Sequence, residues 1–523
     1  MKRFSAFHPF LLSIFPILFL AANNMDEVRA TDLLFLLPTA VIGTLLLMVA
    51  AKAVTKSYQK AAIITSWTLA LFYSYGYVSD LLSSWRTESF TTASHHWFLE
   101  AIWLLLLAVV ALPVIRARRS FLTMTKLLNV IAAVLVAISL FNMGTYAVRA
   151  TNLERPALNE EGNGLIVENP DDLPDIYYII LDSYGRDDTL SDVYDYDNSE
   201  FTDYLTDRGF YVASGSRANY SETVQSVASS LNMEYPAVLQ DGILDTMDSS
   251  QLTRMIVDSE VSRLLKSVGY RYILVFSGWN LKDMNEYAEV YSYAYEIGWG
   301  SARIRISSFA EHLLGSTALG PLADSLITAE GRNSILYFFD ALSGVVDARG
   351  PKFVLAHVTS PHPPWYFDRD GGPALPSDQP YASGFSGGAF LRPPSWYDKE
   401  RYVDQLAFVN SKIEPIIEAI LSGSDTAPII IVQADHGPWT YPNEDGASNE
   451  TIVERQMAEK MRILNAYYLP GKNNRLLYES ITPVNSFRVV FNLFFGTTYQ
   501  MLPEESYFAE VGNPRRIVTV PPE

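Results

Sequence analysis

Five apolar segments in the first 150 residues constrain the fold of this chain more than any other feature. They cover residues 10–22, 33–51, 61–78, 97–115 and 127–146. Most of them are close in length to the stretch of about 20 apolar residues that is needed to span a bilayer as an α-helix. Glu100 is the one charged residue inside them, so a buried bundle of a soluble protein is the weaker interpretation. The first segment is short, and Leu20-Ala21-Ala22 resembles a signal-peptide cleavage site, so this segment is also a candidate leader.

Positive charge alternates between the loops that join these segments. Basic residues precede the first segment and fill the loops after the second and the fourth, namely Lys2, Arg3, Lys52, Lys56, Lys60, Arg116, Arg118, Arg119 and Lys126. The two other loops carry Arg29 and Arg86 alone. Because cytoplasmic loops are rich in Lys and Arg, we expect the N-terminus inside and residue 147 onward outside the cell membrane. Transport pathways need ionisable groups within the membrane, so we interpret this half as an anchor or lipid-docking module.

Charge and cysteine content exclude several partners and chemistries. Of the 39 basic and 58 acidic residues of the chain, residues 1–150 hold 12 and 6, which leaves 27 and 52 for the rest. An acidic outer half argues against nucleic acid as a partner, because nucleic-acid binding rests on cationic surfaces. The chain has no cysteine, which excludes thiol catalysis, zinc–thiolate sites and disulfides.

The rest of the chain predicts an α/β domain. Residues 151–172 are polar, contain Pro and Gly, and are interpreted as a linker. After them, apolar strands alternate with helical patterns: strands at 176–181, 270–276, 353–358 and 428–433, and helices at 199–208, 223–233, 261–268 and 400–422. This alternation indicates a mostly parallel sheet with helices on both faces. We therefore divide the chain into an anchor (1–150), the linker and a domain at 173–523, in which 366–398 is a long loop.

Residues that can bind a metal follow several of these strands. Asp182 directly follows the first predicted strand, and Asp435-His436 follows the last one. His357 lies at the end of the third strand, and His362 lies in the Pro-rich loop after it. In open α/β sheets the ligand site lies beyond the carboxyl ends of the strands, so we expect these side chains to lie close together.

One set of side chains can hold a single divalent cation. Asp182, Thr223, Asp435 and His436 would supply three oxygens and one nitrogen. Oxygen ligands favour Mn²⁺ or Mg²⁺, and the imidazole also suits Zn²⁺. Thr223 opens a predicted helix, where the backbone N–H groups create a field that favours an oxyanion.

This group of possible metal ligands predicts covalent catalysis by Thr223. Metal coordination lowers the pKa of a hydroxyl, so the Thr oxygen could attack a phosphorus or sulfur centre and form an ester. That ester would pass to an acceptor hydroxyl or to water. His362, and less directly His357, could hold the anionic group or protonate the leaving oxygen. Ser221 and Ser226 are alternative nucleophiles.

Each of these residues also has a structural interpretation. Asp435 or Thr223 could merely cap a helix, and His357 could be a hydrogen-bonded core histidine. Trp365 and Trp439 flank the metal motifs. They could form walls of a substrate site or pack in the core.

The order of these residues resembles the alkaline phosphatase and sulfatase superfamily. Five membrane segments followed by such a domain look like the lipoteichoic acid synthases and the lipid A phosphoethanolamine transferases. The stretches 402–410 and 481–487 are similar to segments of those enzymes. The resemblance implies an extracytoplasmic alkaline-phosphatase-like domain in which one acid, a nucleophilic Thr and an Asp-His pair bind one metal. In this chain these residues are Asp182, Thr223, Asp435 and His436, with His362 as the His that contacts substrate.

Three departures from the pattern narrow the choice of branch. The acid is Asp182, where the headgroup transferases usually have Glu. The sulfatase signature of Cys or Ser followed by x-Pro-x-Arg is absent, because residues 223, 225 and 227 are Thr, Gln and Val. The Asp-x-x-x-His pair of two-zinc phosphatases is also absent. The last two departures favour the one-metal transferases over formylglycine sulfatases and two-zinc phosphatases.

We therefore expect a membrane enzyme that moves a phospho-headgroup from a lipid donor to an extracytoplasmic glycan or lipid acceptor. The first alternative is a hydrolase of phosphate or sulfate esters on cell-surface polysaccharide, which would use the same residues with water as the acceptor. The second alternative is a non-catalytic membrane protein that binds a glycan. The sequence identifies neither the headgroup nor the oligomeric state.

Overall fold

The computed structural model falls into two units, and each is described by itself. It describes residues 6–25, 28, 30–83, 92–151, 164–167, 173–235, 249–277, 288–292, 296–299, 302–305, 308–374, 398–439, 449–471, 474–510 and 513–521. The helical unit consists of residues 1–156, 295–329 and 377–393. The sheet unit consists of residues 157–294, 330–376 and 394–523. Most of the predicted loop at 366–398 lies outside the described residues.

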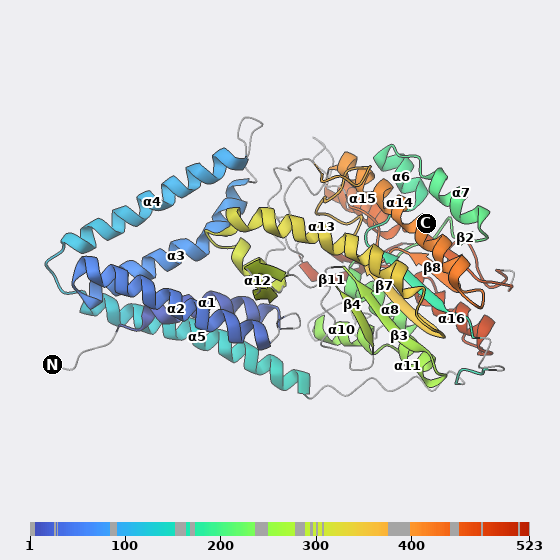
Figure 1. Ribbon diagram of the computed structural model, residues 1–523, viewed down its shortest axis with the longest axis horizontal. Coiled ribbons are helices and arrows are strands. Elements are labelled where there is room, and N and C mark those ends of the chain that lie inside the picture. The colour runs from blue at the N-terminus through green and yellow to red at the C-terminus, as the bar shows by residue number, and fades with distance from the viewer. Residues whose placement is uncertain are drawn as a thin grey trace. The chain divides into compact units, whose positions relative to one another are not determined.

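The five predicted apolar segments are helices. They are α1 (His8–Asn23), α2 (Ala30–Thr55), α3 (Tyr58–Ser83), α4 (Thr92–Arg116) and α5 (Leu122–Thr151) (Figure 1). Within the described residues, three stretches are long and apolar enough to cross a membrane, namely Thr31–Thr55, Trp97–Arg116 and Leu122–Val148. At most 17% of each of these windows is buried, so most of their apolar side chains face outward, as lipid contact requires. The apolar helix α1 is shorter, and α3 is long but more polar.

Polar contacts close one end of the helical unit. The side-chain oxygen of Asn129 on α5 accepts hydrogen bonds from the backbone N–H groups of Phe7 and His8, at 3.1 and 2.9 Å, where α1 begins. These N–H groups have no partner within a helix, so Asn129 satisfies them. Lys60 is one of the basic residues predicted to lie on the cytoplasmic side. Its Nζ donates to the carbonyl oxygen of Ile115 at 2.8 Å. These contacts join α1 to α5 and α3 to α4.

The helical unit also contains residues from much later in the sequence. They form the two-stranded hairpin of β5 (Glu296–Trp299) and β6 (Ala302–Arg305), then α12 (Ser308–Gly315). The helix α13 (Gly320–Val345) follows, and its residues from 330 onward belong to the sheet unit.

A seven-stranded sheet organises the other unit. The strand order is β2-β9-β8-β1-β7-β3-β4. The strands are β1 (Ile176–Leu181), β2 (Tyr211–Val212), β3 (Arg271–Phe276), β4 (Glu289–Ser292), β7 (Lys352–Val358), β8 (Ile429–Gln433) and β9 (Asn465–Tyr468). The five strands from β8 to β4 are parallel; at one edge β9 runs antiparallel to β8, and β2 runs antiparallel to β9. The prediction of a mostly parallel sheet is confirmed.

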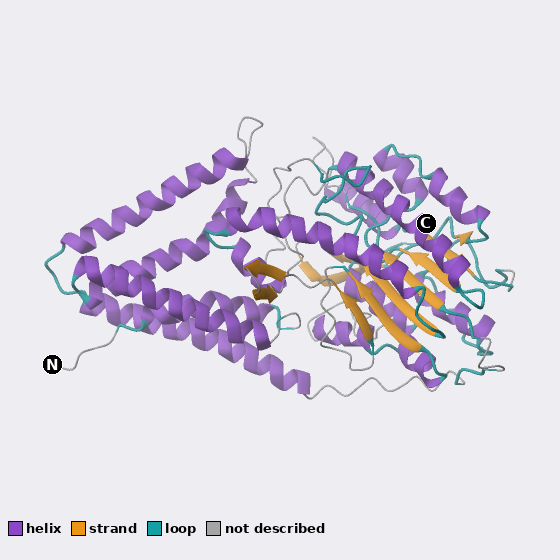
Figure 2. Ribbon diagram, viewed as in Figure 1, coloured by secondary structure: helices purple, strands orange, loops and turns teal. Residues whose placement is uncertain are grey.

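Helices cover both faces of this sheet (Figure 2). They are α6 (Asp187–Tyr194), α7 (Ser199–Asp207), α8 (Thr223–Asn232), α10 (Ser249–Val257), α11 (Glu260–Ser267), α14 (Lys399–Gly423), α15 (Asn449–Met461) and α16 (Pro483–Phe494). A small hairpin of β10 (Tyr507–Glu510) and β11 (Asn513–Thr519) ends the chain. Alternate residues of β1 enter two different apolar clusters: Tyr177 and Ile179 face one, Tyr178 and Ile180 the other. Burial on both faces explains why the central strands are continuous apolar runs rather than alternating ones.

A buried ion pair joins the amino ends of the central strands. Lys352 Nζ lies 2.6 Å from a carboxylate oxygen of Asp175, and both side chains are buried. Lys352 Nζ also donates to the carbonyl oxygen of Ala348 at 2.8 Å. The carbonyl oxygen of Asp175 accepts from the N–H of Ile429 at 2.8 Å. The pair thus links β1, β7 and β8 at the end opposite the candidate site.

Candidate active site

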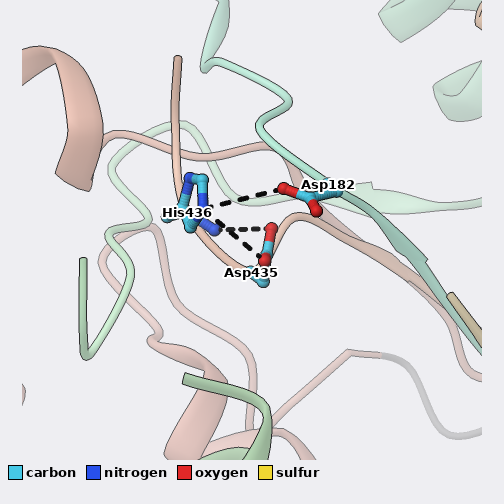
Figure 3. A group of neighbouring side chains, drawn as sticks. All are labelled: Asp182, Asp435 and His436. Carbon is cyan, nitrogen blue, oxygen red and sulfur yellow. Dashed lines mark hydrogen bonds and ion pairs between the residues drawn. The ribbon is translucent and has the colours of Figure 1, made fainter. Parts of the chain in front are cut away.

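The carboxyl ends of three adjacent parallel strands bring the predicted metal ligands together. Asp182 directly follows β1, and Asp435 and His436 follow β8, which pairs with β1. On the other side of β1, His357 in β7 lies in register with Ile180. The side chains of Asp182, Asp435 and His436 point toward one another (Figure 3). The strand pairing therefore explains the convergence of residues that are more than 250 positions apart.

The three ligand side chains form a compact, buried group. His436 Nε2 lies 3.6 Å from Asp182 Oδ1 and 3.8 Å from Asp435 Oδ2. One potential ligand atom from each residue lies within 4.8 Å of the others. Among the described residues, Asp182 Oδ1 and Asp435 Oδ2 have no hydrogen-bond partner. A buried carboxylate oxygen without a donor is unfavourable, whereas a bound cation would satisfy it. The donor set therefore fits a divalent metal, and these residues are a candidate metal site.

Backbone contacts fix the ring of His436. Its Nδ1 lies 2.9 Å from the carbonyl oxygen of Gly437. A carbonyl oxygen can only accept, so Nδ1 carries the proton and Nε2 directs its lone pair toward the carboxylates. Gly437 must be a glycine, because a Cβ there would lie 2.3 Å from the carbonyl oxygen of Glu459. This close approach gives the Gly of the Asp-His-Gly sequence a steric role.

Thr223 is the hydroxyl that faces this group. It is the first residue of α8, and its Oγ1 lies 3.3 Å from His436 Nε2. The two alternative nucleophiles are engaged elsewhere. Ser226 Oγ donates to the carbonyl oxygen of Asp435 at 2.6 Å, and Ser221 Oγ accepts from the N–H of Ala509 at 2.9 Å. Both serines are buried.

Burial sets the protonation states of the site. It raises the pKa of Asp182 well above the ordinary value, and the nearby carboxylate of Asp435 raises it further. Burial opposes ionisation of Asp435 as well, but His436, His357 and hydrogen bonds outweigh it and hold the pKa of Asp435 below its usual range. Burial lowers the pKa of His357 to about 4 and also lowers the pKa of His436, so both rings are neutral at pH 7. Without a cation, Asp182 therefore tends to keep its proton.

The other predicted residues surround the candidate metal site in different ways. His357 is buried, and its Nε2 lies 3.8 Å from Asp182 Oδ2. The backbone N–H of His362 donates to the carbonyl oxygen of Asp182 at 3.0 Å, and its ring centroid lies 6.1 Å from that of His436. Trp365 is only 4% exposed and packs edge-on against Tyr402.

Two charged residues beside Thr223 were not found from the sequence. Lys460 on α15 is buried, and its Nζ lies 2.8 Å from Glu222 Oε1. The same Nζ lies 5.1 Å from the ring centroid of Trp439. The charge of Lys460 partly opposes the rise that burial causes in the pKa of Asp182, and it adds to the lowering that burial causes in the pKa of His436. Lys460 follows the Asp-His pair by more than 20 residues without a motif of its own, so only the packing of α15 shows that it belongs here.

The helix α14 holds the turn that carries Asp182. Tyr402 is buried, and its hydroxyl donates to the carbonyl oxygen of Ser183 at 3.0 Å. The same hydroxyl accepts from the N–H of Gly185 at 3.1 Å. Ser183 has a positive φ of 68°, a conformation that non-glycine residues rarely adopt without support. Tyr402 therefore stabilises the backbone immediately after Asp182.

The same helix holds the loop that carries His362. Gln405 is fully buried on α14, one turn from Tyr402. Its Nε2 lies 3.1 to 3.3 Å from the carbonyl oxygens of Pro361, His362 and Pro364. Its Oε1 accepts from a further backbone N–H of this loop at 2.7 Å. The stretch 402–410 was noted in the sequence without a role, and this contact pattern supplies one.

Comparison with known families agrees with this architecture. The sulfatase family profile matches residues 174–488, which is more than half of the chain. The chain belongs to the sulfatase family. It is a sulfatase-like enzyme, a phosphotransferase or an ester hydrolase, as the sequence predicted. No protein with a curated description matches the chain.

Several solved structures are similar to the chain at low sequence identity. The periplasmic domain of EptC from Escherichia coli, in complex with Zn, is 12% identical; the match covers 70% of this chain and 96% of that one, with a TM-score of 0.42. The lipooligosaccharide phosphoethanolamine transferase A (EptA) from Neisseria meningitidis is 12% identical, with coverages of 94% and 95% and a TM-score of 0.39. A putative sulfatase from Bacteroides fragilis is 14% identical, with coverages of 66% and 83% and a TM-score of 0.37. At these values the similarity says nothing about substrate.

Proposed function

We propose that this chain is an integral-membrane phosphotransferase that acts through a covalent Thr223 intermediate. It would take a phospho-headgroup from a membrane lipid and place it on an extracytoplasmic glycan or lipid. The observation that carries the proposal is the position of Thr223 Oγ1, 3.3 Å from His436 Nε2. Beside it lie two buried carboxylates, each with one oxygen that has no hydrogen-bond donor among the described residues. A nucleophile poised at a metal group is the arrangement that covalent phosphoryl transfer requires.

The residues would divide the reaction between them. A divalent cation held by Asp182, Asp435 and His436 would lower the pKa of the Thr223 hydroxyl and offset charge on the phosphoryl oxygens. The Thr223 oxygen would attack phosphorus, forming one P–O bond while the bond to the lipid oxygen breaks. His362 would supply the proton to that leaving oxygen. An acceptor hydroxyl would then attack the same phosphorus, the bond to the Thr223 oxygen would break, and the acceptor's proton would return to His362.

Lys460 supplies a positive charge for the anionic group. Its ammonium is fixed by the carboxylate of Glu222, the residue before the nucleophile, and lies over the ring of Trp439. A buried cation strengthens binding of a phosphoryl oxygen because the surroundings screen it poorly. The donor set of mainly oxygen atoms favours Mn²⁺ or Mg²⁺, and Zn²⁺ also fits.

The membrane half fits a lipid donor. We propose a multi-pass protein of the cell membrane, with Thr223 outside the cytoplasm. The alternating basic loops and the outward-facing apolar helices support this orientation. A headgroup donor must be met at the bilayer surface, and the helical unit keeps the enzyme there.

The test is capture of the intermediate. Purified full-length protein would be incubated with Mn²⁺ and membrane phospholipids, and its intact mass measured and any adduct mapped. We expect an adduct on Thr223, whose mass would identify the headgroup. Thr223→Ala should lose both the adduct and turnover while still binding metal, and Thr223→Ser should keep some of each. Full activity of Thr223→Ala would refute the mechanism. No adduct in a metal-loaded wild type would favour ester hydrolysis with water as the acceptor.

A further inference from the structure

A segment from the second half of the sequence is built into the helical unit. Residues 295–329 leave the sheet unit after β4 and return to it within α13. In α12 the side chain of Phe309 is fully buried, and that of Leu313 is 6% exposed. Both belong to one apolar cluster with three residues near the end of α1, namely Ile17, Leu20 and Ala21. Partly buried neighbours from α2, α3 and α5 surround this cluster, including Leu33, Leu36, Leu37, Tyr73 and Met143.

Backbone hydrogen bonds also join this segment to α3. The N–H of Gly76 donates to the carbonyl oxygen of Ser316 at 3.0 Å, and the carbonyl oxygen of Phe72 accepts from the N–H of Ala318 at 3.0 Å. Residues 72 and 76 are the pair that hydrogen-bond to each other in a regular α-helix. The segment thus contacts the hydrogen-bond ladder of α3 itself. Such a contact requires two backbones to approach closely.

Glycine at position 76 permits this approach. A Cβ on Gly76 would lie 2.6 Å from the Cα of Ser316 and 2.8 Å from the carbonyl oxygen of Gly315. Both are backbone atoms, so no side chain could move aside. In contrast, a Cβ on Gly144 of α5 would have no atom within 4 Å. The two glycines therefore differ sharply in what an alanine would do.

The contacts lie at a defined end of the bundle. Helices α1, α3 and α5 contribute residues near their C-terminal ends, and α2 contributes residues near its start. This is the end opposite the contacts of Asn129 and Lys60 described above. By the distribution of basic residues it is the end predicted to face outside. The segment therefore contacts the same end of the bundle as the C-terminal end of α5.

We propose that residues 308–318 are a second attachment between the catalytic half and the membrane helices, in addition to the covalent connection through residues 152–172. The partner surface is the outer end of the chain's own bundle, formed by α1, α2, α3 and α5. The attachment would keep the enzyme at the bilayer surface even when the linker is cut. This proposal does not depend on the reaction that the site catalyses.

Cutting the linker of the full-length protein tests the proposal. A protease site would be placed within residues 152–163, which lie outside the described residues, and each end of the chain would carry a different tag. After complete cleavage in detergent, we expect the C-terminal fragment to copurify with the N-terminal one. Gly76→Ala should raise the dissociated fraction about tenfold, because the added Cβ would overlap backbone atoms that no side-chain movement can clear. Gly144→Ala should behave as wild type. Loss of the wild-type C-terminal fragment after cleavage, or dissociation of Gly144→Ala as large as that of Gly76→Ala, would overturn the proposal.

The absence of cysteine allows a second measurement that reports directly on the proximity of α1 and α12. Leu20→Cys and Leu313→Cys place one thiol on each side of the cluster. Mild oxidation in membranes should link the two cleaved fragments into one band on a non-reducing gel. The control pair is Leu313→Cys with Leu127→Cys, since Leu127 is exposed near the start of α5. Linkage in the first pair alone supports the attachment, and no linkage or equal linkage in both pairs contradicts it.

Discussion

Replacing Gln405 by Leu is the sharpest single test of how this site is positioned. The leucine would keep most of the volume but remove both polar atoms from a fully buried position. Three carbonyl oxygens, those of Pro361, His362 and Pro364, would lose their shared donor, and one backbone N–H would lose its acceptor. A buried polar group left without a partner costs about 1–3 kcal/mol. The loop would relax in part, so we expect a net loss of about 2–4 kcal/mol in the free energy of unfolding.

The same change should slow turnover while leaving metal binding intact. Gln405 contacts the loop of His362, and the turn after Asp182 is held by Tyr402 instead. A displacement of about 1 Å in a positioned catalytic group can cost about 10²-fold in rate. We therefore expect kcat to fall by about 10²-fold with a phosphodiester substrate. Metal content should be unchanged.

The assay compares kcat, KM and bound metal for wild type, Gln405→Leu and Ser411→Ala. Ser411 lies on the same helix with an exposed side chain, so its alanine variant should match wild type in all three quantities. Wild-type kcat in Gln405→Leu would refute the idea that this amide positions His362. Parallel loss of metal and kcat would show that the two loops are not held separately.

Three other predictions concern the candidate metal site and the ion pair of Lys352 with Asp175. Tyr402→Phe removes the hydroxyl that holds the turn after Asp182. Metal affinity, measured by calorimetry, should therefore fall by about tenfold or more, and unchanged affinity would contradict that role. Because burial and Asp435 raise the pKa of Asp182, metal binding should release a proton and tighten as pH rises; calorimetry in buffers of different ionisation enthalpy should detect that proton, and its absence would count against the raised pKa. Lys352→Met leaves Asp175 buried and unpaired, which should cost about 3–5 kcal/mol in denaturant unfolding, whereas Lys352→Met with Asp175→Asn should recover much of it.

The sequence indicates the parts of the site that lie next to strand ends. Apolar runs bounded by Asp182 and by Asp435 mark buried parallel strands, and parallel strands bring their carboxyl ends together. Lys460 could not be found in this way, since its place depends on how α15 packs. The burial of Trp365 likewise depends on its contact with Tyr402, which lies 37 positions away.

The attachment through residues 308–318 could not be predicted from the sequence for a related reason. Its helix α12 is eight residues long, too short to stand out as a membrane element. The division at residue 150 followed hydropathy and charge, which describe local composition. Contact between Gly76 and Ser316 is a property of two backbones, and composition carries no signal for it.

A single helix explains how the two loops of the candidate site keep one geometry. Tyr402 and Gln405 are three residues apart, so both side chains project from the same side of α14. One fixes the turn after β1, and the other fixes the loop after β7. Further along α14, Asn410 accepts a hydrogen bond from the Tyr184 hydroxyl at 2.7 Å, which anchors the β1 turn a second time. Because a helix is rigid over this length, movement of either loop must break buried hydrogen bonds rather than bend a chain. The helix α14 therefore supports the distance between Asp182 and His362, together with the hydrogen bond from the His362 N–H to the Asp182 carbonyl oxygen, although none of its residues is a predicted ligand of the metal.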